Sequence, residues 1–211
     1  MRVFVVLLIV FLAKTSKAQN SSVAVHGTAL SILGETTGGS RIGDDFGLGL
    51  NLRMAAPFFL RNLEINGEIS YYQINIDYTQ SGSEISFNHT KASQYNIGGG
   101  LTLYLFQKGK RPSMYHPYRF YISGYAGASA HTNEIVESHN INPRFTVFEG
   151  LSLFPYGDLL GGIKIRIDPR NSIDLFTGAR MALSDAVDGI AGTGGAPDLM
   201  IRLGLGFCHS L

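Results

Sequence analysis

The chain has 211 residues, of which 16% are charged and 26 are glycine, and its formal net charge is +1. A charged fraction well below the typical value of about 25%, together with near-neutrality, argues against nucleic acid as a partner. Cys208 is the only cysteine, which excludes an intrachain disulfide, so stability must come from the fold itself.

The N-terminal segment, residues 1–18, has the three parts of a secretory signal peptide. Arg2 supplies a positive charge, residues 3–13 are unbroken apolar sequence, and a small-x-small pattern precedes Gln19. We expect cleavage between Ala18 and Gln19, leaving one mature domain of residues 19–211. No later apolar run reaches the roughly 20 residues of a transmembrane helix, so a membrane-spanning domain would have to be a closed β-barrel.

Beyond this segment, apolar and polar residues alternate with a period of two in eight stretches, which is typical of strands with one apolar and one polar face. The first stretch is the weakest and is assigned mainly from its context. In the third, the apolar parity changes after Tyr72, and we expect a β-bulge near Tyr72 and Gln73. The predicted strands are residues 23–32, 46–54, 63–78, 95–105, 119–128, 154–167, 173–183 and 199–207.

The clearest hairpin runs from Leu159 to Leu183. Its first arm alternates isoleucines with Lys164 and Arg166, and the segment DPRNS supplies the turn before the alternation resumes. Arms of about 9 to 11 residues match the strands of a transmembrane β-barrel.

Long and short connections alternate along the chain. The long polar ones are residues 33–45, 79–93, 131–144 and 184–197, and the shorter ones are residues 55–61, 107–117 and the DPRNS turn. With eight strands and an N-terminus delivered from the periplasm, the long connections are expected outside the cell.

The apolar face decides between two kinds of barrel. A soluble lipocalin-like carrier would point it inward around a ligand, whereas a membrane barrel points it toward lipid. The opposite face mixes Gly, Ser and charges of both signs, which suits a narrow lumen filled by side chains rather than a solute channel. We therefore predict an all-β, eight-stranded antiparallel up-and-down transmembrane barrel, with a lumenal ion-pair network of Arg53, Glu64, Glu68, Arg119, Lys164, Arg166, Asp174, Arg180 and Arg202.

Catalytic and metal-binding patterns are weak. His26 with Ser31, His131 and His139 are the candidates for a lipid-modifying enzyme, but none lies in a recognisable nucleophile motif. His131, Glu134, Glu137 and His139 have ligand chemistry at plausible spacing, in what reads as a solvated loop. Asp185 and Asp188 form a possible loop site, although the oxygen-rich spacing of a full calcium loop is missing. We expect no enzyme activity, no cofactor and no bound metal.

The stretch GGIKIRIDPRNSIDLFTGARMALSDAVDGIAG, followed by an apolar last strand, resembles the C-terminal part of the PorG-like outer-membrane barrels of Bacteroidota, which accompany type IX secretion and gliding. Gly162-Ile163-Lys164 and the acidic loop Asp185 to Gly189 occupy the places of the family's motifs. Ala186 and Val187 lie between the two Asp residues of this loop, which lacks the family's usual adjacent acidic pair. The resemblance implies an accessory barrel that docks periplasmic secretion or motility components.

The leading hypothesis is therefore a structural accessory barrel of the outer membrane, with outer-membrane lipid and periplasmic components as partners. A general outer-membrane integrity or adhesion barrel is the alternative, and the lipocalin-like carrier and the lipid-modifying enzyme are further alternatives.

Overall fold

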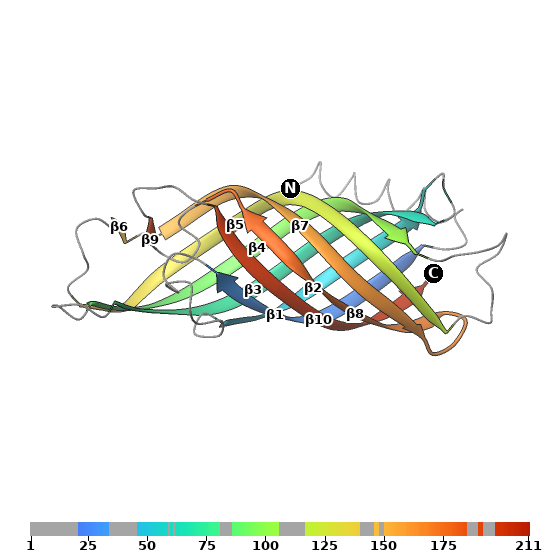
Figure 1. The fold of residues 1–211 in the computed structure, drawn as a ribbon, viewed down its shortest axis with the longest axis horizontal. Coiled ribbons are helices and arrows are strands. Elements are labelled where there is room, and N and C mark those ends of the chain that lie inside the picture. Colours follow the sequence, from blue (N-terminus) through green and yellow to red (C-terminus); the bar gives the residue numbers. More distant parts are fainter. Residues whose placement is uncertain are drawn as a thin grey trace.

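A computed structural model describes residues 21–33, 46–58, 60, 62–80, 86–105, 117–139, 146–147, 150–184, 190–191 and 197–211. Eight antiparallel strands form a closed barrel in which each strand pairs with its sequence neighbours and the first pairs with the last (Figure 1). This confirms the predicted fold class. The signal segment, including Ala18 and Gln19, lies outside the described residues. The barrel strands are β1 (Ser22–Leu33), β2 (Phe46–Pro57), β3 (Leu63–Gln80), β4 (Ser86–Tyr104), β5 (Tyr118–His139), β7 (Gly150–Arg166), β8 (Asn171–Ala182) and β10 (Asp198–Ser210).

Two short strands, β6 (Thr146–Val147) and β9 (Ile190–Ala191), pair with each other outside the barrel. The described residues contain no helix with the length and apolarity needed to cross a membrane.

The predicted alternation between outward and inward residues is confirmed. On β2, Leu48 and Leu50 are more than half exposed whereas Arg53 is buried. On β10, Leu203 is exposed and Arg202 is 0% exposed. The apolar face therefore points outward and the polar face lines the lumen, which contradicts the lipocalin-like arrangement.

The bulge predicted near Tyr72 and Gln73 is wrong. The pairing of β3 with β4 continues through this region without a shift, and Tyr72 and Ile74 are both fully buried in the lumen. The parity changes in the sequence because the lumen becomes apolar at this level, where both residues belong to a cluster with Leu30 and Met200. The register shift that does occur lies between β4 and β5, at His89 and Thr90.

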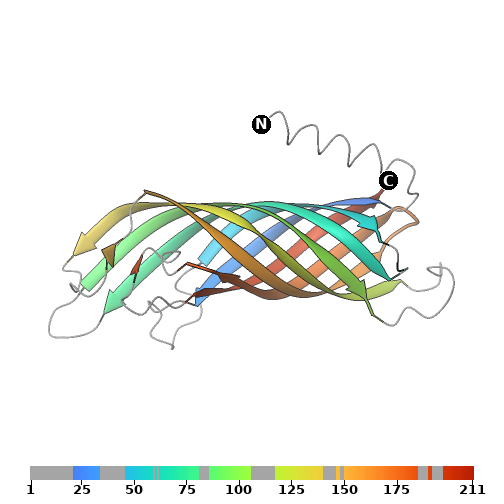
Figure 2. The same ribbon diagram turned by 90° about the horizontal axis from the view of Figure 1, so that it is seen from above.

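Three strands extend well past the others. The expected loop of residues 79–93 is mostly the hairpin of β3 and β4, and the expected loop of residues 131–144 begins as strand, since β5 continues to His139. In Figures 1 and 2 these strands reach beyond β1 and β10 at one end of the barrel, which we call the projecting end. Polar composition there indicated exposure to water, not the absence of strand.

The opposite end, which we call the turn end, holds the C-terminus and the predicted tight turn between β7 and β8. The Asp168 carboxylate accepts hydrogen bonds from the backbone N–H groups of Arg170 (2.8 Å) and Asn171 (2.9 Å) and from the Asn171 side chain (2.6 Å). The bond from the Asn171 side chain and that from the Arg170 backbone hold the pKa of Asp168 below its ordinary value. The turn is therefore fixed by its own side chains.

Two adjacent glycines on β7, one facing the lumen and one facing outward, allow a test of the barrel's packing. A Cβ on Gly162 would meet the Tyr121 ring and the backbone oxygen of Leu175, whereas a Cβ on Gly161 would meet nothing within 4 Å. Valine is well tolerated in strands in general. The two substitutions therefore differ mainly in whether the new side chain points into the lumen or out toward lipid. We expect Gly162→Val to destabilise the barrel by at least about 1–3 kcal/mol, the usual cost of overpacking, and Gly161→Val to be tolerated. The measurement is the gel shift of the unboiled protein on heating; equal behaviour of the two variants would contradict the inward placement of Gly162.

Candidate functional site

Two arginines occupy the middle of the lumen between two carboxylates. Arg180 donates to Asp158 through Nε (2.7 Å) and Nη2 (2.8 Å), and its Nη2 also lies 3.1 Å from Glu68 Oε1. Arg202 contacts the same two carboxylates and donates to the Tyr72 hydroxyl at 2.7 Å. Because the side chains of Arg180, Arg202, Asp158 and Glu68 are fully buried, each charge is neutralised inside the barrel rather than by water.

A second group lies next to this pair, toward the turn end. Arg53 reaches Glu68 at 3.4 Å and Asp174 at 3.7 Å. Asp174 also accepts from the Tyr121 hydroxyl at 2.8 Å and lies 3.0 Å from His26 Nε2. The Arg53 guanidinium further lies 5.0 Å from the centre of the Phe176 ring and 5.1 Å from that of Tyr125.

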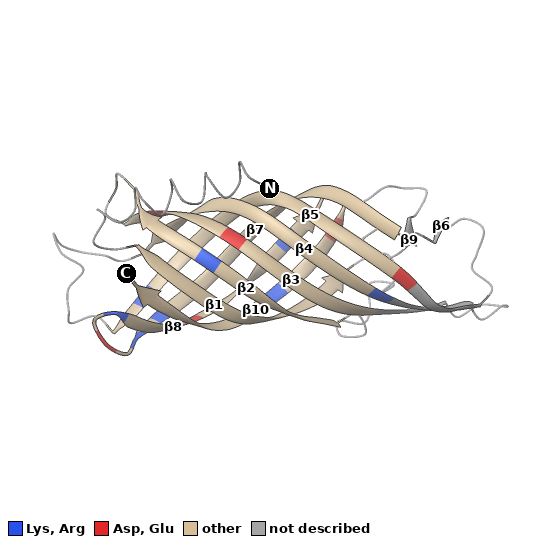
Figure 3. Ribbon diagram, turned by 180° about the vertical axis from the view of Figure 1, so that it is seen from behind, with Lys and Arg blue, Asp and Glu red and all other residues tan. Residues whose placement is uncertain are grey.

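These six charged residues, which we call the central network, balance each other. Arg53, Arg180 and Arg202 face Glu68, Asp158 and Asp174, and the charges cancel when all are ionised. In Figure 3, blue (Lys, Arg) and red (Asp, Glu) segments lie on neighbouring strands in the middle part of the barrel. A neutral set is the form in which buried charges are least costly, so the network fills the lumen without attracting ions of one sign.

A separate polar group closes the lumen near the turn end. The Tyr104 hydroxyl donates to Glu64 at 2.7 Å and accepts from Lys164 at 2.7 Å, while Lys164 lies 3.8 Å from Glu64. The Arg119 guanidinium stacks on the Tyr104 ring at 3.8 Å. Cys208 is also buried.

Toward the projecting end the lumen holds apolar and amide side chains. Gln94 donates to Asn96 and to Ser129, both at 3.0 Å, and Asn96 donates to Ser70 at 3.1 Å. The apolar cluster beside them comprises Leu30, Ile32, Tyr72, Ile74, Ala92, Phe154, Ala182 and Met200. Side chains therefore fill the described part of the lumen, as expected for eight strands.

The structure brings together five of the nine residues named for the lumen network: Arg53, Glu68, Asp174, Arg180 and Arg202. Glu64 and Lys164 pair separately. Arg166 does not join either group, because it donates to the carbonyls of Asp168 (3.0 Å) and Pro169 (3.2 Å) in the exposed turn. Its parity is inward, but its position is past the end of the lumen.

Sequence reasoning missed Asp158 and the lumenal role of His26. Asp158 lies one residue before the predicted hairpin of residues 159–183 and has the parity of Lys164 and Arg166, so the same alternation, extended backward, indicates it. The sequence indicates His26 only as a catalytic candidate. Its partner Asp174 is 148 positions away in the chain, and no local pattern could have indicated that pairing.

The catalytic and metal candidates are dispersed. His26 points into the lumen, whereas Ser31 has the opposite parity on β1. His131 is buried and lies 2.6 Å from Asn133, while Glu134 is exposed on the same strand, so strand geometry separates the proposed ligands. The described residues contain no group of three or more His, Cys, Asp or Glu that could hold a metal. Asp185 and Asp188, and the side chains of Glu137 and His139, lie outside the described residues.

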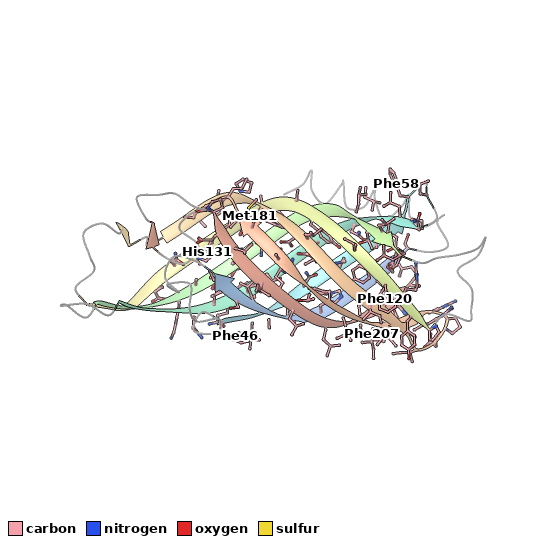
Figure 4. The ribbon with its side chains drawn as sticks, in the orientation of Figure 1. Phe46, Phe58, Phe120, His131, Met181 and Phe207 are labelled. Atoms are coloured by element: carbon pink, nitrogen blue, oxygen red, sulfur yellow. The ribbon has the colours of Figure 1, made fainter. Side chains whose placement is uncertain are left out.

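The outer wall carries an apolar belt bounded by aromatic residues. On β10, Leu199 to Phe207 spans about 27 Å along the strand, or roughly 20 Å of height at the usual tilt. Phe58, Phe120 and Phe207 lie toward the turn end and Phe46 toward the other side of the belt (Figure 4). Exposed Tyr71 and Tyr95 continue the second margin. A band of this kind fits the hydrocarbon core of a bilayer.

The fold and this belt define an outer-membrane β-barrel embedded in lipid. Known structures show the same fold: the chain superposes on Neisserial surface protein A with a TM-score of 0.60 and 9% identity, over 90% of this chain and 97% of that one. At this identity the likeness shows the fold alone.

Two further structures match less well. They are Ail of Yersinia pestis (TM-score 0.46, 14% identity, 90% of this chain and 99% of that one) and OprG of Pseudomonas aeruginosa (0.45, 12%, 92% and 97%). The sequence matches no family model and no curated protein. The PorG-like resemblance therefore stays a prediction.

The central network predicts that loss of a carboxylate inside it destabilises the barrel more than loss of a carboxylate outside it. Asp158→Asn leaves Arg180 and Arg202 with one fewer buried counter-charge, and we expect a loss of about 3–5 kcal/mol in the free energy of unfolding. Glu64→Gln is the matched control, because Glu64 is 14% exposed and its amide can still accept from Tyr104; we expect a markedly smaller loss. Urea unfolding in lipid vesicles measures both. Equal losses would contradict the central role of Asp158.

Proposed function

We propose that this protein is a non-catalytic outer-membrane barrel that anchors a projecting β-sheet for contact with macromolecules outside the cell. The observation that carries the proposal is the continuation of β3, β4 and β5 beyond the membrane belt. It corresponds to the adhesion alternative rather than to a transport role, since side chains fill the described lumen.

The projecting sheet starts where its neighbours stop. The last residue of β3 that pairs with β2 is Asn75, whereas its pairing with β4 continues to Gln80. From Tyr71 at the belt margin to Gln80 is about 30 Å at about 3.3 Å per residue. Likewise β5 pairs with β7 only as far as Asn133 but with β4 as far as His139.

Both outer strands of this sheet have backbone groups that no described strand pairs with. Such edges are templates for an added strand, and extended peptides bind sheets in this way. The proposal places the projecting end outside the cell, because the C-terminus lies at the turn end and long connections of outer-membrane barrels face outward.

Shortening the projecting hairpin tests this function. Asn75 and Lys91 are register partners, so replacing residues 76–90 by Asn-Gly closes the hairpin with a two-residue turn. We expect the shortened barrel to fold and shift on heating but to lose adherence. The measurement compares bacteria that display either form, or neither, on immobilised serum and matrix proteins. Equal adherence of the full-length and shortened forms would refute the proposal.

A second candidate is the PorG-like accessory role in secretion or motility, which the braced turn end favours. The Asn171 side chain also contacts His209 at 2.8 Å, and the Ser210 backbone N–H donates to the Arg170 carbonyl at 2.7 Å. The turn and the last strand thus form one rigid surface on the periplasmic side, of the kind a docked component would need.

This second function predicts a phenotype at the turn end. Arg170 is exposed and contributes to the turn through its backbone N–H and carbonyl groups, so Arg170→Glu should leave the fold intact. Combined with charge reversal at Lys108, Lys110 and Arg111, which lie outside the described residues, it should reduce secretion of a type IX cargo into the medium. Normal secretion with a normal heat shift would remove this candidate, and the shortened hairpin serves as the control.

A further inference from the structure

The outer wall of the barrel carries an apolar groove of about 630 Å³, within the roughly 300–1,000 Å³ of small-molecule sites. It runs across β1 to β7 within the membrane belt. Its lining includes the outward side chains of Ile69, Tyr71, Tyr95, Ile97, Ala128 and Leu153. Because the groove opens toward the bilayer, lipid acyl chains are the molecules that can enter it.

The hollow has a clear structural cause on β5. Ala128 is paired with Ile97, and Ala130 is paired with both Tyr95 and Leu153. The flanking side chains are large and Leu153 is 75% exposed, so two alanines lie between raised walls. A groove of this shape holds a chain in one position, whereas a flat lipid-facing wall does not.

Toward the projecting end, the groove is followed by a polar surface on the projecting sheet. The Tyr71 and Tyr95 rings lie 4.9 Å apart at the belt margin. Directly beyond them, Gln73, Ser93 and Thr132 form one cross-strand row, and Asn75, Lys91 and Glu134 form the next. All but the half-buried Ser93 are exposed.

The chemistry of these two rows distinguishes between lipid headgroups. A phosphate recruits cations, but Lys91 is the one cation in the two rows and faces Glu134. Amides, hydroxyls and a carboxylate offer donors and acceptors to sugar hydroxyls, and tyrosine rings offer an apolar face. Two rows along three strands also exceed the extent of a small phosphate headgroup.

We propose that this wall is a glycolipid-binding site, with an acyl chain in the groove and the saccharide headgroup against the rows of Gln73 and Asn75. The site lies in the outer leaflet, which relies on the orientation given under the proposed function. Of the residues in the two rows, only Glu134 lies past the last residue of β5 that pairs with β7, so the site depends on the outward face of the strands and not on the free edges that carry that function.

The test uses lipopolysaccharide, the outer-leaflet glycolipid, as the probe and phosphatidylethanolamine as the competitor. Barrels purified in mild detergent are loaded with both, and the retained lipid is identified by native mass spectrometry. We expect the wild type to retain lipopolysaccharide preferentially and Ala128→Leu, which fills the groove, to reduce retention about tenfold, equivalent to about 1.4 kcal/mol. Gln73→Ala with Asn75→Ala should shift the retained lipid toward phosphatidylethanolamine.

The matched control is Ala179→Leu, which adds the same side chain to the outward face of β8 between Leu159 and Ile201. It should retain lipopolysaccharide like the wild type. Equal retention by all variants, equal retention of phosphatidylethanolamine by the wild type, or a wild-type dimer that Ala128→Leu dissociates would each overturn the proposal. The shortened hairpin keeps both rows, so it should lose adherence yet retain the glycolipid, which separates failure of this site from failure of the proposed function.

Discussion

The constraint on which the structure depends is that backbone N–H and C=O groups inside a bilayer must be paired within the protein. A sheet satisfies this only by closing, and here β1 pairs with β10 over its whole length, from Ser22 with Ser210 to Leu33 with Leu199. Closure then assigns every residue to one of two environments by parity. Outward residues must suit lipid, while inward residues must find partners in a narrow lumen, whatever their polarity.

The lumen meets that second requirement with contacts between opposite walls. Arg180 on β8 contacts Asp158 on the neighbouring β7 and also Glu68 on β3, a strand with which β8 shares no backbone hydrogen bonds. Buried ion pairs add little net stability compared with apolar packing. Their effect here is on alignment, because a slip of one residue would move Glu68 or Arg180 into lipid.

Much of this arrangement could be predicted from the alternation alone. The period of two located all eight barrel strands and the inward face of Arg53, Arg180 and Arg202, because lipid imposes one rule on every outward position. It failed where that rule does not apply. Tyr72 and Ile74 are apolar yet inward, so the pattern was misinterpreted as a bulge.

Contacts between side chains across the lumen could not be predicted from the sequence, for a different reason. Which inward residues meet depends on the stagger between strands around the whole barrel, and no local pattern contains it. Parity assigned Arg166 to the lumenal face but could not show that its side chain lies past the end of the lumen, in the exposed turn. The extensions of β4 and β5 escaped prediction because polar residues predominate there in the sequence, which resembles a loop, whereas the alternation predicts β3 as far as residue 78, close to its end at Gln80.

The extensions are also the part of the chain that membrane physics leaves unexplained. Within the bilayer, pairing is obligatory; beyond it, backbone groups can bond to water, and ordering them costs about 1–2 kcal/mol per residue. β1, β2, β8 and β10 end near the belt accordingly, whereas β3, β4 and β5 continue. The membrane does not require these paired extensions of β3, β4 and β5. Their function must therefore account for them. The outer surface, rather than the filled lumen, is therefore where the activity of this protein should be sought.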